Sequence, residues 1–169
     1  MAQDEKLKPH QVLAVAIHSE IDAAAFYRKL RTKVKNEVLL QKLDFLIFEE
    51  LKHKKILEKL FSQRFRDRAA DAPKKALMPP IRASVGPRPS VFDLFKAALA
   101  AEKEAEAFYN KAARSIDDDL SRNLLSYLGR VERSHQAIIR SEIDLLRQFP
   151  DSYKVQDFHV GHDLFHIGP

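Results

Sequence analysis

The chain of 169 residues contains no cysteine and only four glycines. Without cysteine it forms no disulfide, thiolate metal site or iron–sulfur cluster, and it has no cysteine nucleophile. It has no apolar run near the roughly 20 residues that span a bilayer, and its first residues lack the apolar core of a secretory signal. We therefore expect a cytoplasmic protein with no membrane partner.

The abundant residues indicate a helical, globular protein. Long stretches are rich in alanine, leucine, glutamate, lysine and arginine, which favour helices, and the content is 45% apolar and 31% charged. The formal charge of +5 raises the question of a nucleic-acid partner. Basic residues cluster at 28–35 and 52–68, but acidic residues interrupt the second span. A solvated basic face is therefore the favoured interpretation, and no nucleic-acid partner is expected.

Apolar periodicity predicts four long helices, at residues 10–34, 36–64, 90–115 and 118–147. The first break is short, so the first two helices should pack as an antiparallel hairpin. Residues 66–89 hold five of the eight prolines and cannot form a long helix. An extended connection of this length reaches about 80 Å, whereas a helix of about 25 residues is roughly 38 Å long. We expect this crossover to span the full length of a bundle and to start the third helix at the end where the first began.

The prediction is thus an all-α, antiparallel four-helix bundle at residues 1–150, followed by a C-terminal tail at 151–169. The tail contains three histidines with aromatic residues between them, and histidine-rich tracts can bind metal. We favour a tail that docks on the bundle or on a dimer partner through its aromatic residues. The histidines are His159, His162 and His166, and the aromatic residues are Tyr153, Phe158 and Phe165.

Polar residues interrupt the apolar seams of all four helices. In the second helix, Glu50 and His53 stand in a heptad seam of five leucines. An unpaired buried carboxylate costs several kcal/mol at least, so such a group is normally paired or bound to a metal. The polar residues of the four seams are Glu20 in the first, Glu50 and His53 in the second, Glu102 in the third, and Glu132 and His135 in the fourth.

The four seams are two copies of one helix pair. Each polar seam residue of the first pair, and Tyr27, is followed 82 residues later by a residue of the same type, so Tyr109 is the counterpart of Tyr27. The segment AAAFY at 23–27 likewise matches AEAFY at 105–109. One Glu-x-x-His pattern occurs by chance in many helices, but two at the same distance from a seam glutamate and tyrosine indicate a metal site.

The spacing places the ligands on common helix faces. Residues three apart share a face, so Glu50 with His53, and Glu132 with His135, can each ligate one metal. Four carboxylates carry four negative charges, which two divalent cations balance. This pattern is typical of di-iron and di-manganese bundles. Oxygen-rich coordination with one histidine per metal suits iron or manganese. We prefer two Fe ions because redox chemistry explains a paired centre, with Mn or Zn possible in a purified sample.

Two further groups of residues lie near the predicted site. Tyr27 and Tyr109 are expected to hydrogen-bond ligand carboxylates on neighbouring helices. Three acidic residues close to the seams are expected to face solvent, namely Asp22, Glu49 and Glu104. Glu106 lies four residues after Glu102 and could lean towards the site, but that is the less favoured interpretation.

On these residues the chain resembles the ferritin-like superfamily and, within it, the rubrerythrin-type proteins. The motifs that carry the resemblance are HSEIDAAAFY, EELKH, AEKEAEAFY and VERSH, and it covers residues 10–149. The resemblance implies a ferritin-like bundle with a long crossover, a di-iron site, reaction with peroxide or dioxygen, and a homodimer.

Three features depart from these relatives. Rubrerythrins carry a four-cysteine rubredoxin-like domain, which this sequence lacks, so the electron donor is unknown. They also carry a further glutamate where this chain has Ala105. Bacterioferritins place a haem-ligating methionine where this chain has Leu51, so we predict no haem.

The leading hypothesis is a non-haem di-iron oxidoreductase of peroxidase or ferroxidase type that uses H2O2 or O2, with the six seam ligands as its catalytic residues. The alternative is an iron-binding or storage protein without significant turnover. A DNA-associated mini-ferritin is less favoured, because those proteins build their sites between subunits and all six ligands here fit one bundle.

Overall fold

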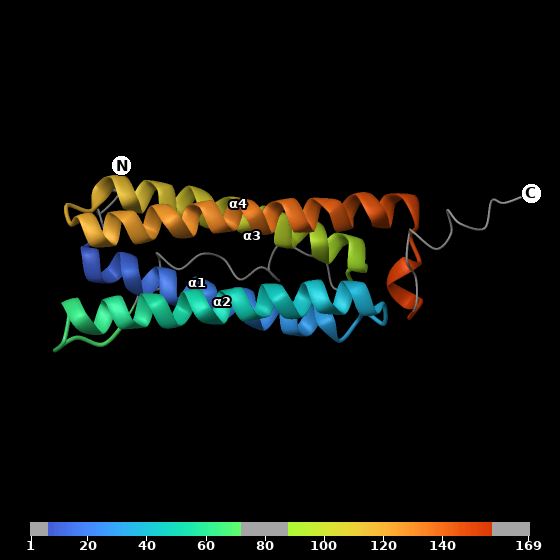
Figure 1. Ribbon diagram of the computed structural model, residues 1–169. Coiled ribbons are helices and arrows are strands. Elements are labelled where there is room, and N and C mark those ends of the chain that lie inside the picture. Colours follow the sequence, from blue (N-terminus) through green and yellow to red (C-terminus); the bar gives the residue numbers. More distant parts are fainter. Residues whose placement is uncertain (1–6, 72–87, 157–169) are drawn as a thin grey trace, which may run out of the picture.

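The computed structural model describes residues 7–71 and 88–156, and four long helices make up most of them (Figure 1). Helix α1 spans Pro9–Arg31, α2 spans Glu37–Arg64, α3 spans Val91–Ser115, α4 spans Asp119–Gln148, and a 3-10 helix, η3, spans Ser152–Lys154. No strand occurs in these two stretches, and no helix in them is long and apolar enough to cross a membrane. The predicted all-α four-helix bundle is confirmed.

Side-chain caps set three of the helix starts at the predicted positions, with Asn36 before α2, Ser90 before α3 and Asp118 before α4. The Asn36 side chain accepts a hydrogen bond from the Leu39 N–H at 2.9 Å and begins α2. Ser90 and Asp93 form a reciprocal capping box at the start of α3. Helix α1 ends at Arg31 rather than Val34, because the chain turns at Thr32; Val34 is still buried, from the connecting turn.

The helices form two antiparallel hairpins, α1 with α2 and α3 with α4 (Figure 1). The predicted starting end of the third helix is wrong, since α3 begins beside the end of α1 and not beside its start. The physical reason is simple: α2 already returns the chain to the start of α1, so a connection along the full bundle leads to the opposite end. Residues 72–87, most of the predicted crossover, lie outside the described residues.

The core consists of two apolar clusters, one towards each end of the bundle. One joins the starts of α1 and α4 to the ends of α2 and α3, and includes Leu13 and Leu57. The other joins the opposite helix ends and includes Leu43 and Phe95. The five seam leucines of α2 and the six polar seam residues are all buried. The part of each helix between the clusters carries the polar seam residues.

The start of the predicted tail docks on the end of the bundle that holds the α1–α2 turn. Tyr153 packs against the second apolar cluster. Its carbonyl oxygen accepts hydrogen bonds from the Lys35 N–H at 2.8 Å and the Asn36 N–H at 3.3 Å. The remaining tail residues for which we made predictions lie outside the described residues, namely Phe158, His159, His162, Phe165 and His166.

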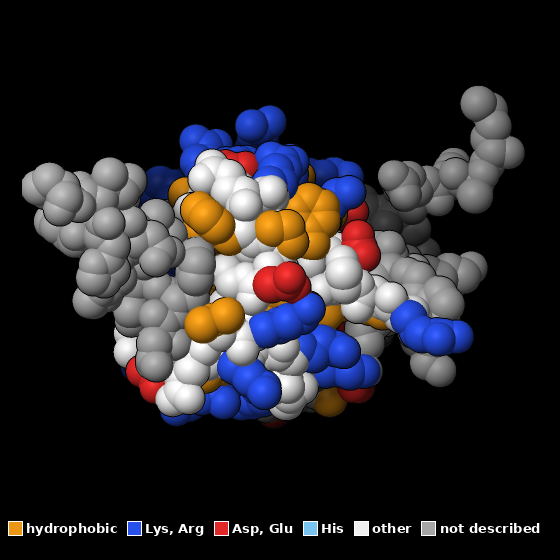
Figure 2. Space-filling view, turned by 90° about the vertical axis from the view of Figure 1, so that its right-hand side faces the viewer, with side chains coloured by type: hydrophobic (Ala, Val, Ile, Leu, Met, Phe, Trp, Pro, Cys, Tyr) orange, Lys and Arg blue, Asp and Glu red, His pale blue; other side chains and the backbone are white. Residues whose placement is uncertain are grey.

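Basic side chains are spread over this same end of the molecule (Figure 2). All five lysine and arginine residues between positions 28 and 35 are exposed, as a solvated basic face requires. Arg31 also pairs with Asp44 of α2 through Nη2, at 3.1 Å. This pair links the two helices of the first hairpin next to their turn.

Candidate metal centre

The six polar seam residues meet in the middle of the bundle, between its two apolar clusters. Helices α2 and α4 contribute two each, and α1 and α3 contribute one each. Every one of them is at most 4% exposed. Four carboxylates and two imidazoles are therefore brought together in an environment that excludes water, as their heptad positions indicated.

The ligand atoms fall into two overlapping groups. Within each group, one imidazole nitrogen or carboxylate oxygen per residue lies within 4.8 Å of the others. Glu50 and Glu132 belong to both groups, which is the position of carboxylates that bridge two ions. The first group is completed by Glu20 and His53, and the second by Glu102 and His135.

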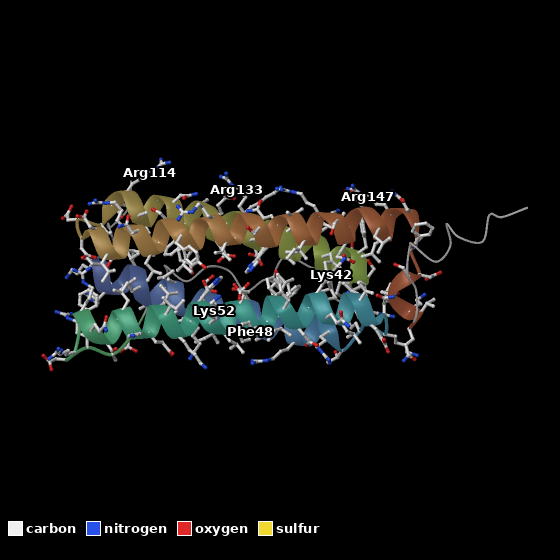
Figure 3. The ribbon with its side chains drawn as sticks, in the orientation of Figure 1. Lys42, Phe48, Lys52, Arg114, Arg133 and Arg147 are labelled. Atoms are coloured by element: carbon white, nitrogen blue, oxygen red, sulfur yellow. The ribbon has the colours of Figure 1, made fainter. Side chains whose placement is uncertain are left out.

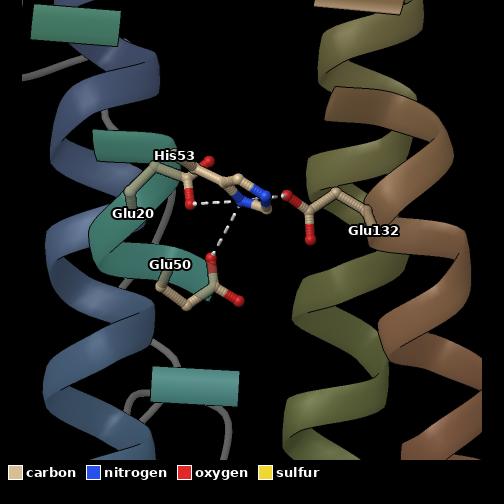
Figure 4. Close-up of side chains that lie close together, drawn as sticks. All are labelled: Glu20, Glu50, His53 and Glu132. Atoms are coloured by element: carbon tan, nitrogen blue, oxygen red, sulfur yellow. Dashed lines mark ion pairs between the residues drawn. The ribbon is translucent and has the colours of Figure 1, made fainter. Parts of the chain in front are cut away.

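His53 turns its Nδ1 atom towards the carboxylates of three helices (Figure 4). The distances from Nδ1 are 3.4 Å to Glu20 Oε2, 3.8 Å to Glu50 Oε2 and 3.9 Å to Glu132 Oε1. These oxygens come from α1, α2 and α4. A cation beside Nδ1 would therefore find ligands from both hairpins.

His135 makes the corresponding approach in the second group. Its Nδ1 atom lies 3.1 Å from Glu50 Oε1, 3.2 Å from Glu132 Oε2 and 3.6 Å from Glu102 Oε2. The rings of His53 and His135 are nearly parallel, with centroids 5.7 Å apart. The two histidines are thus equivalent in how they face the carboxylates.

Several buried atoms of these residues have no hydrogen-bond partner within the described part of the chain. They are both ring nitrogens of His53 and His135, Oε2 of Glu20 and Oε1 of Glu50. A buried polar atom left without a partner costs about 1–3 kcal/mol, and most such atoms are satisfied in native proteins. Because these atoms belong to one cluster of oxygen and nitrogen donors, the residues fit a pair of bound cations.

Tyrosine hydroxyl groups hold the two outer carboxylates. Tyr27 of α1 donates a hydrogen bond to Glu102 of α3, and Tyr109 of α3 donates one to Glu20 of α1. Both tyrosines are fully buried. The hydrogen bonds predicted for these residues are therefore both present, and each one crosses from one hairpin to the other.

Glu50, Glu132 and His135 hold protons tightly in the absence of metal, because the pKa of each group is raised. Burial, with the nearby Glu20 carboxylate, raises the pKa of Glu50, and burial with the neighbouring Glu102 raises the pKa of Glu132. Burial opposes the charged form of His135, but the surrounding carboxylates outweigh it and raise the pKa of this imidazole. Burial also opposes ionisation of Glu102, but Glu132, His135 and Tyr27 outweigh it and lower its pKa. A cation that binds here has to displace protons.

Glu49 is a nearby carboxylate that the sequence interpretation placed wrongly. It was expected to face solvent, but its side chain is only 13% exposed, and Oε2 lies 3.9 Å from Nε2 of His53. Lys52 contacts the same carboxylate at 3.2 Å. The available signal was the spacing, since residues four apart share a helix face. Asp22 and Glu104 are exposed, as expected.

Glu106 is half-buried, and its carboxylate contacts α4 rather than the proposed ligands. Its carboxylate accepts hydrogen bonds from Arg133 Nε at 2.8 Å and from Gln136 Nε2 at 2.7 Å. Gln136 is 2% exposed and also donates to the Glu102 carbonyl oxygen at 3.4 Å. No sequence pattern indicated that Gln136 is buried. It lies beside the heptad seam rather than in it, and its repeat counterpart, Lys54, is charged.

Two side chains of α2, those of Lys42 (labelled in Figure 3) and Phe45, also contact α4. Lys42 donates to Glu142 of α4, which is 2% exposed. Phe45, one turn further along α2, has its ring edge against His135, with centroids 6.5 Å apart. These contacts join α2 to α4, and neither was predicted from the sequence.

Comparisons with known proteins agree with this arrangement. The rubrerythrin family model matches residues 11–143. A hypothetical protein from Pyrococcus furiosus is 32% identical, with a TM-score of 0.76, over 87% of this chain and 95% of that chain. Curated protein sequences contain no match.

Two further solved structures share the fold. A bacterioferritin from Rhodobacter capsulatus, described with a metal-free dinuclear site and haem iron, is 20% identical over 83% of this chain and 86% of its own, with a TM-score of 0.67. A manganese catalase from Anabaena is 17% identical over 94% of this chain and 84% of its own, with a TM-score of 0.63. At these identities the similarity establishes the ferritin-like fold alone.

Proposed function

Because the chain belongs to the rubrerythrin family, we propose that it is a di-iron carboxylate protein whose metal pair reacts with H2O2 or O2. The observation that carries this proposal is the pair of overlapping ligand groups, which share Glu50 and Glu132. The unsatisfied nitrogens of His53 and His135 add support, since both have Nδ1 directed at the carboxylates.

The residues divide into outer and shared ligands. Glu20 and His53 would hold one ion, Glu102 and His135 the other, and Glu50 and Glu132 would bridge them. Oxygen-rich coordination with one nitrogen per metal suits iron or manganese. An iron pair, when bound, supplies two electrons to the oxidant.

The rest of the chain shapes the environment of that reaction. Tyr27 and Tyr109 keep the outer carboxylates Glu102 and Glu20 in place through their hydrogen bonds. The apolar clusters on either side exclude water, which strengthens the interaction of the ligands with cations. We propose that electrons come from a separate protein or small-molecule donor, because this sequence has no cysteine with which to hold a rubredoxin-type iron.

The direct test is anaerobic loading with Fe(II), followed by metal analysis and rapid mixing with H2O2 and with O2 in separate experiments. We expect two Fe per chain and a fast optical change with at least one oxidant. The control is the double variant Glu50→Ala/Glu132→Ala, which should bind little iron and show no fast phase. Less than one transition metal per chain in the wild type would overturn the proposal.

Ala105 favours a second candidate, iron binding or storage without significant turnover. This buried seam residue stands where rubrerythrins carry a further glutamate. Storage needs a shell that encloses mineral, so size-exclusion chromatography separates the two candidates. A homodimer would favour the oxidoreductase, and a large shell that takes up many Fe per chain would favour storage.

We also propose that the centre works without haem. Leu51 follows the bridging Glu50 and offers no sulfur ligand. Purified protein incubated with haemin should show no shifted Soret band after gel filtration, and a stoichiometric shifted band would contradict the proposal.

A further inference from the structure

The internal repeat differs at a position beside the proposed metal centre that carries a charge in one hairpin alone. Every ligand in the first hairpin has an identical counterpart in the second, but the counterpart of Glu49 is Val131. Glu49 and Val131 are both half-buried, so they occupy similar places on α2 and α4. Among the described residues, only the hairpin of α1 and α2 therefore offers an additional carboxylate within 4 Å of its histidine.

This difference concerns Nε2 of each histidine, the ring nitrogen that points away from the carboxylate cluster. His53 directs Nδ1 at Glu20 and the bridging carboxylates, and its Nε2 atom, on the other edge, lies 3.9 Å from Glu49 Oε2. Nε2 of both histidines lacks a hydrogen-bond partner in the described part of the chain, but the described ion-pair contacts of His135 all involve Nδ1, so its Nε2 has no carboxylate at a comparable distance. The two metal positions thus have equal ligands but unequal surroundings.

Metal-ligating histidines almost always donate their second ring N–H to a carboxylate, carbonyl or water. Such a partner fixes the tautomer that leaves the other nitrogen free to bind metal, and it makes that nitrogen more basic. The Glu49 carboxylate is held near Nε2 by Lys52 at 3.2 Å. The Glu49 oxygen lies 3.9 Å from Nε2, and a shift of about 1 Å brings it to hydrogen-bond distance.

We propose that Glu49 is a positioning residue for His53, and that the metal position at His53 consequently binds its ion more tightly than the position at His135. Glu49 itself is not a ligand, because it lies on the edge of the ring away from the site. The inference rests on the proposed di-metal centre, and it adds that the position at His53 binds a metal ion before the position at His135 does. Removing a hydrogen-bond partner of this kind lowers metal affinity about 10- to 100-fold.

The test is a titration of metal-free protein with Co(II), followed by its visible absorption bands and by calorimetry. The wild type should fill in two steps that differ in affinity by about 10- to 100-fold. Glu49→Val copies the residue found on α4 and should weaken the tight step until both steps coincide. The reciprocal variant Val131→Glu should strengthen the weak step instead. The matched control Glu58→Gln changes an exposed carboxylate of the same helix and should leave both steps unchanged.

Nuclear magnetic resonance of the Co(II) protein gives a second measurement that a merely structural role would not alter. A hydrogen-bonded Nε2–H of a Co(II)-bound histidine exchanges slowly and appears as a strongly shifted, exchangeable proton signal. We expect one such signal in the wild type, none in Glu49→Val and two in Val131→Glu. Glu49→Gln, which preserves the shape and an acceptor oxygen, should retain a weaker, faster-exchanging signal and covers the case in which Glu49→Val misfolds.

The two proposals fail in different ways. Two equal Co(II) steps in the wild type, or two unequal steps that persist in correctly folded Glu49→Val, overturn the role of Glu49 and leave the di-metal centre intact. If the wild type binds no Co(II) or Fe(II), both proposals are wrong.

Discussion

Glu50 and Glu132 are the residues on which both proposed metal positions depend. Each belongs to both ligand groups, whereas Glu20 and Glu102 belong to one group each. We therefore expect Glu20→Ala to retain about half of the bound Fe(II), because one ligand set stays complete, and Glu50→Ala to retain almost none. Metal analysis after anaerobic loading and desalting measures this. Equal losses in the two variants would contradict the division into outer and shared ligands.

The hydrogen bond of Tyr27 across the bundle should contribute measurably to the free energy of unfolding. Its hydroxyl donates to Glu102, and both residues are buried. Hydrogen bonds to charged groups contribute about 1.5–3 kcal/mol, so Tyr27→Phe should lower the free energy of unfolding by that amount. Urea denaturation measures the change. Tyr127→Phe, at a position that is 39% exposed, is the control and should change stability by less than about 0.5 kcal/mol.

The residues predicted from sequence were those whose polarity contradicts their heptad position. Glu20, Glu50 and His53 stand where only apolar residues are expected, and the repeat reinforces them. Glu49 and Gln136 lie at the edge of a seam, where a polar residue is unremarkable. Whether such a residue is buried depends on the rotation of its helix and on the bulk of its neighbours. The rotation of a helix and the bulk of its neighbours depend on how the helices pack together, so the sequence of one helix does not determine them.

At the scale of the elements, the side-chain cap of α2 should contribute measurably to the free energy of unfolding. The Asn36 side chain accepts a hydrogen bond from the Leu39 N–H and donates one to the Val155 carbonyl oxygen at 3.2 Å. Replacing an N-cap asparagine by alanine costs about 0.5–2 kcal/mol, so Asn36→Ala should lower the free energy of unfolding by about 1–2 kcal/mol. Thermal and urea denaturation check this. Ser134→Ala, at an exposed position within α4, should change stability by less than about 0.5 kcal/mol; a similar loss there would rule out a specific effect of the cap.

Helix existence and length were predictable because the seams are long and the caps explicit. The start of α2 at Asn36 and the start of α3 at Ser90 follow from residues that compete for backbone N–H groups. The end of α1 was less predictable, since Val34 is buried without being helical. The orientation of α3 needed chain geometry, because local propensity says nothing about the end of the bundle at which a helix starts.

At the scale of the whole molecule, the buried charges make stability depend on pH. Glu50, Glu132 and His135 have raised pKa values in the folded, metal-free protein. In the unfolded chain the pKa is about 4.3 for glutamate and about 6.5 for histidine. Above about pH 5 the folded state therefore binds more protons than the unfolded state, and stability falls as pH rises. The lowered pKa of Glu102 acts only at more acid pH.

We accordingly expect the free energy of unfolding of the metal-free protein, measured by urea denaturation with chelator, to decrease between pH 5 and pH 8. Glu50→Gln removes one of the titrating groups and should make this slope shallower. The stabilisation gained on adding metal should increase over the same range, because ions compete with protons for the ligands. A metal-free protein whose stability rises steadily from pH 5 to pH 8 would show that these groups do not hold their protons.

The pairing of the helices has a further consequence for the history and assembly of the protein. One hairpin contains two glutamates and one histidine of the ligand set, which is half of a complete site, and the crossed tyrosine hydrogen bonds always join one hairpin to the other. The chain is in this sense a fused pair of similar subunits. A single ancestral hairpin would have possessed a complete site only by associating with its own copy. Two present-day chains that exchanged hairpins would likewise keep every ligand, and each such assembly would contain two complete centres.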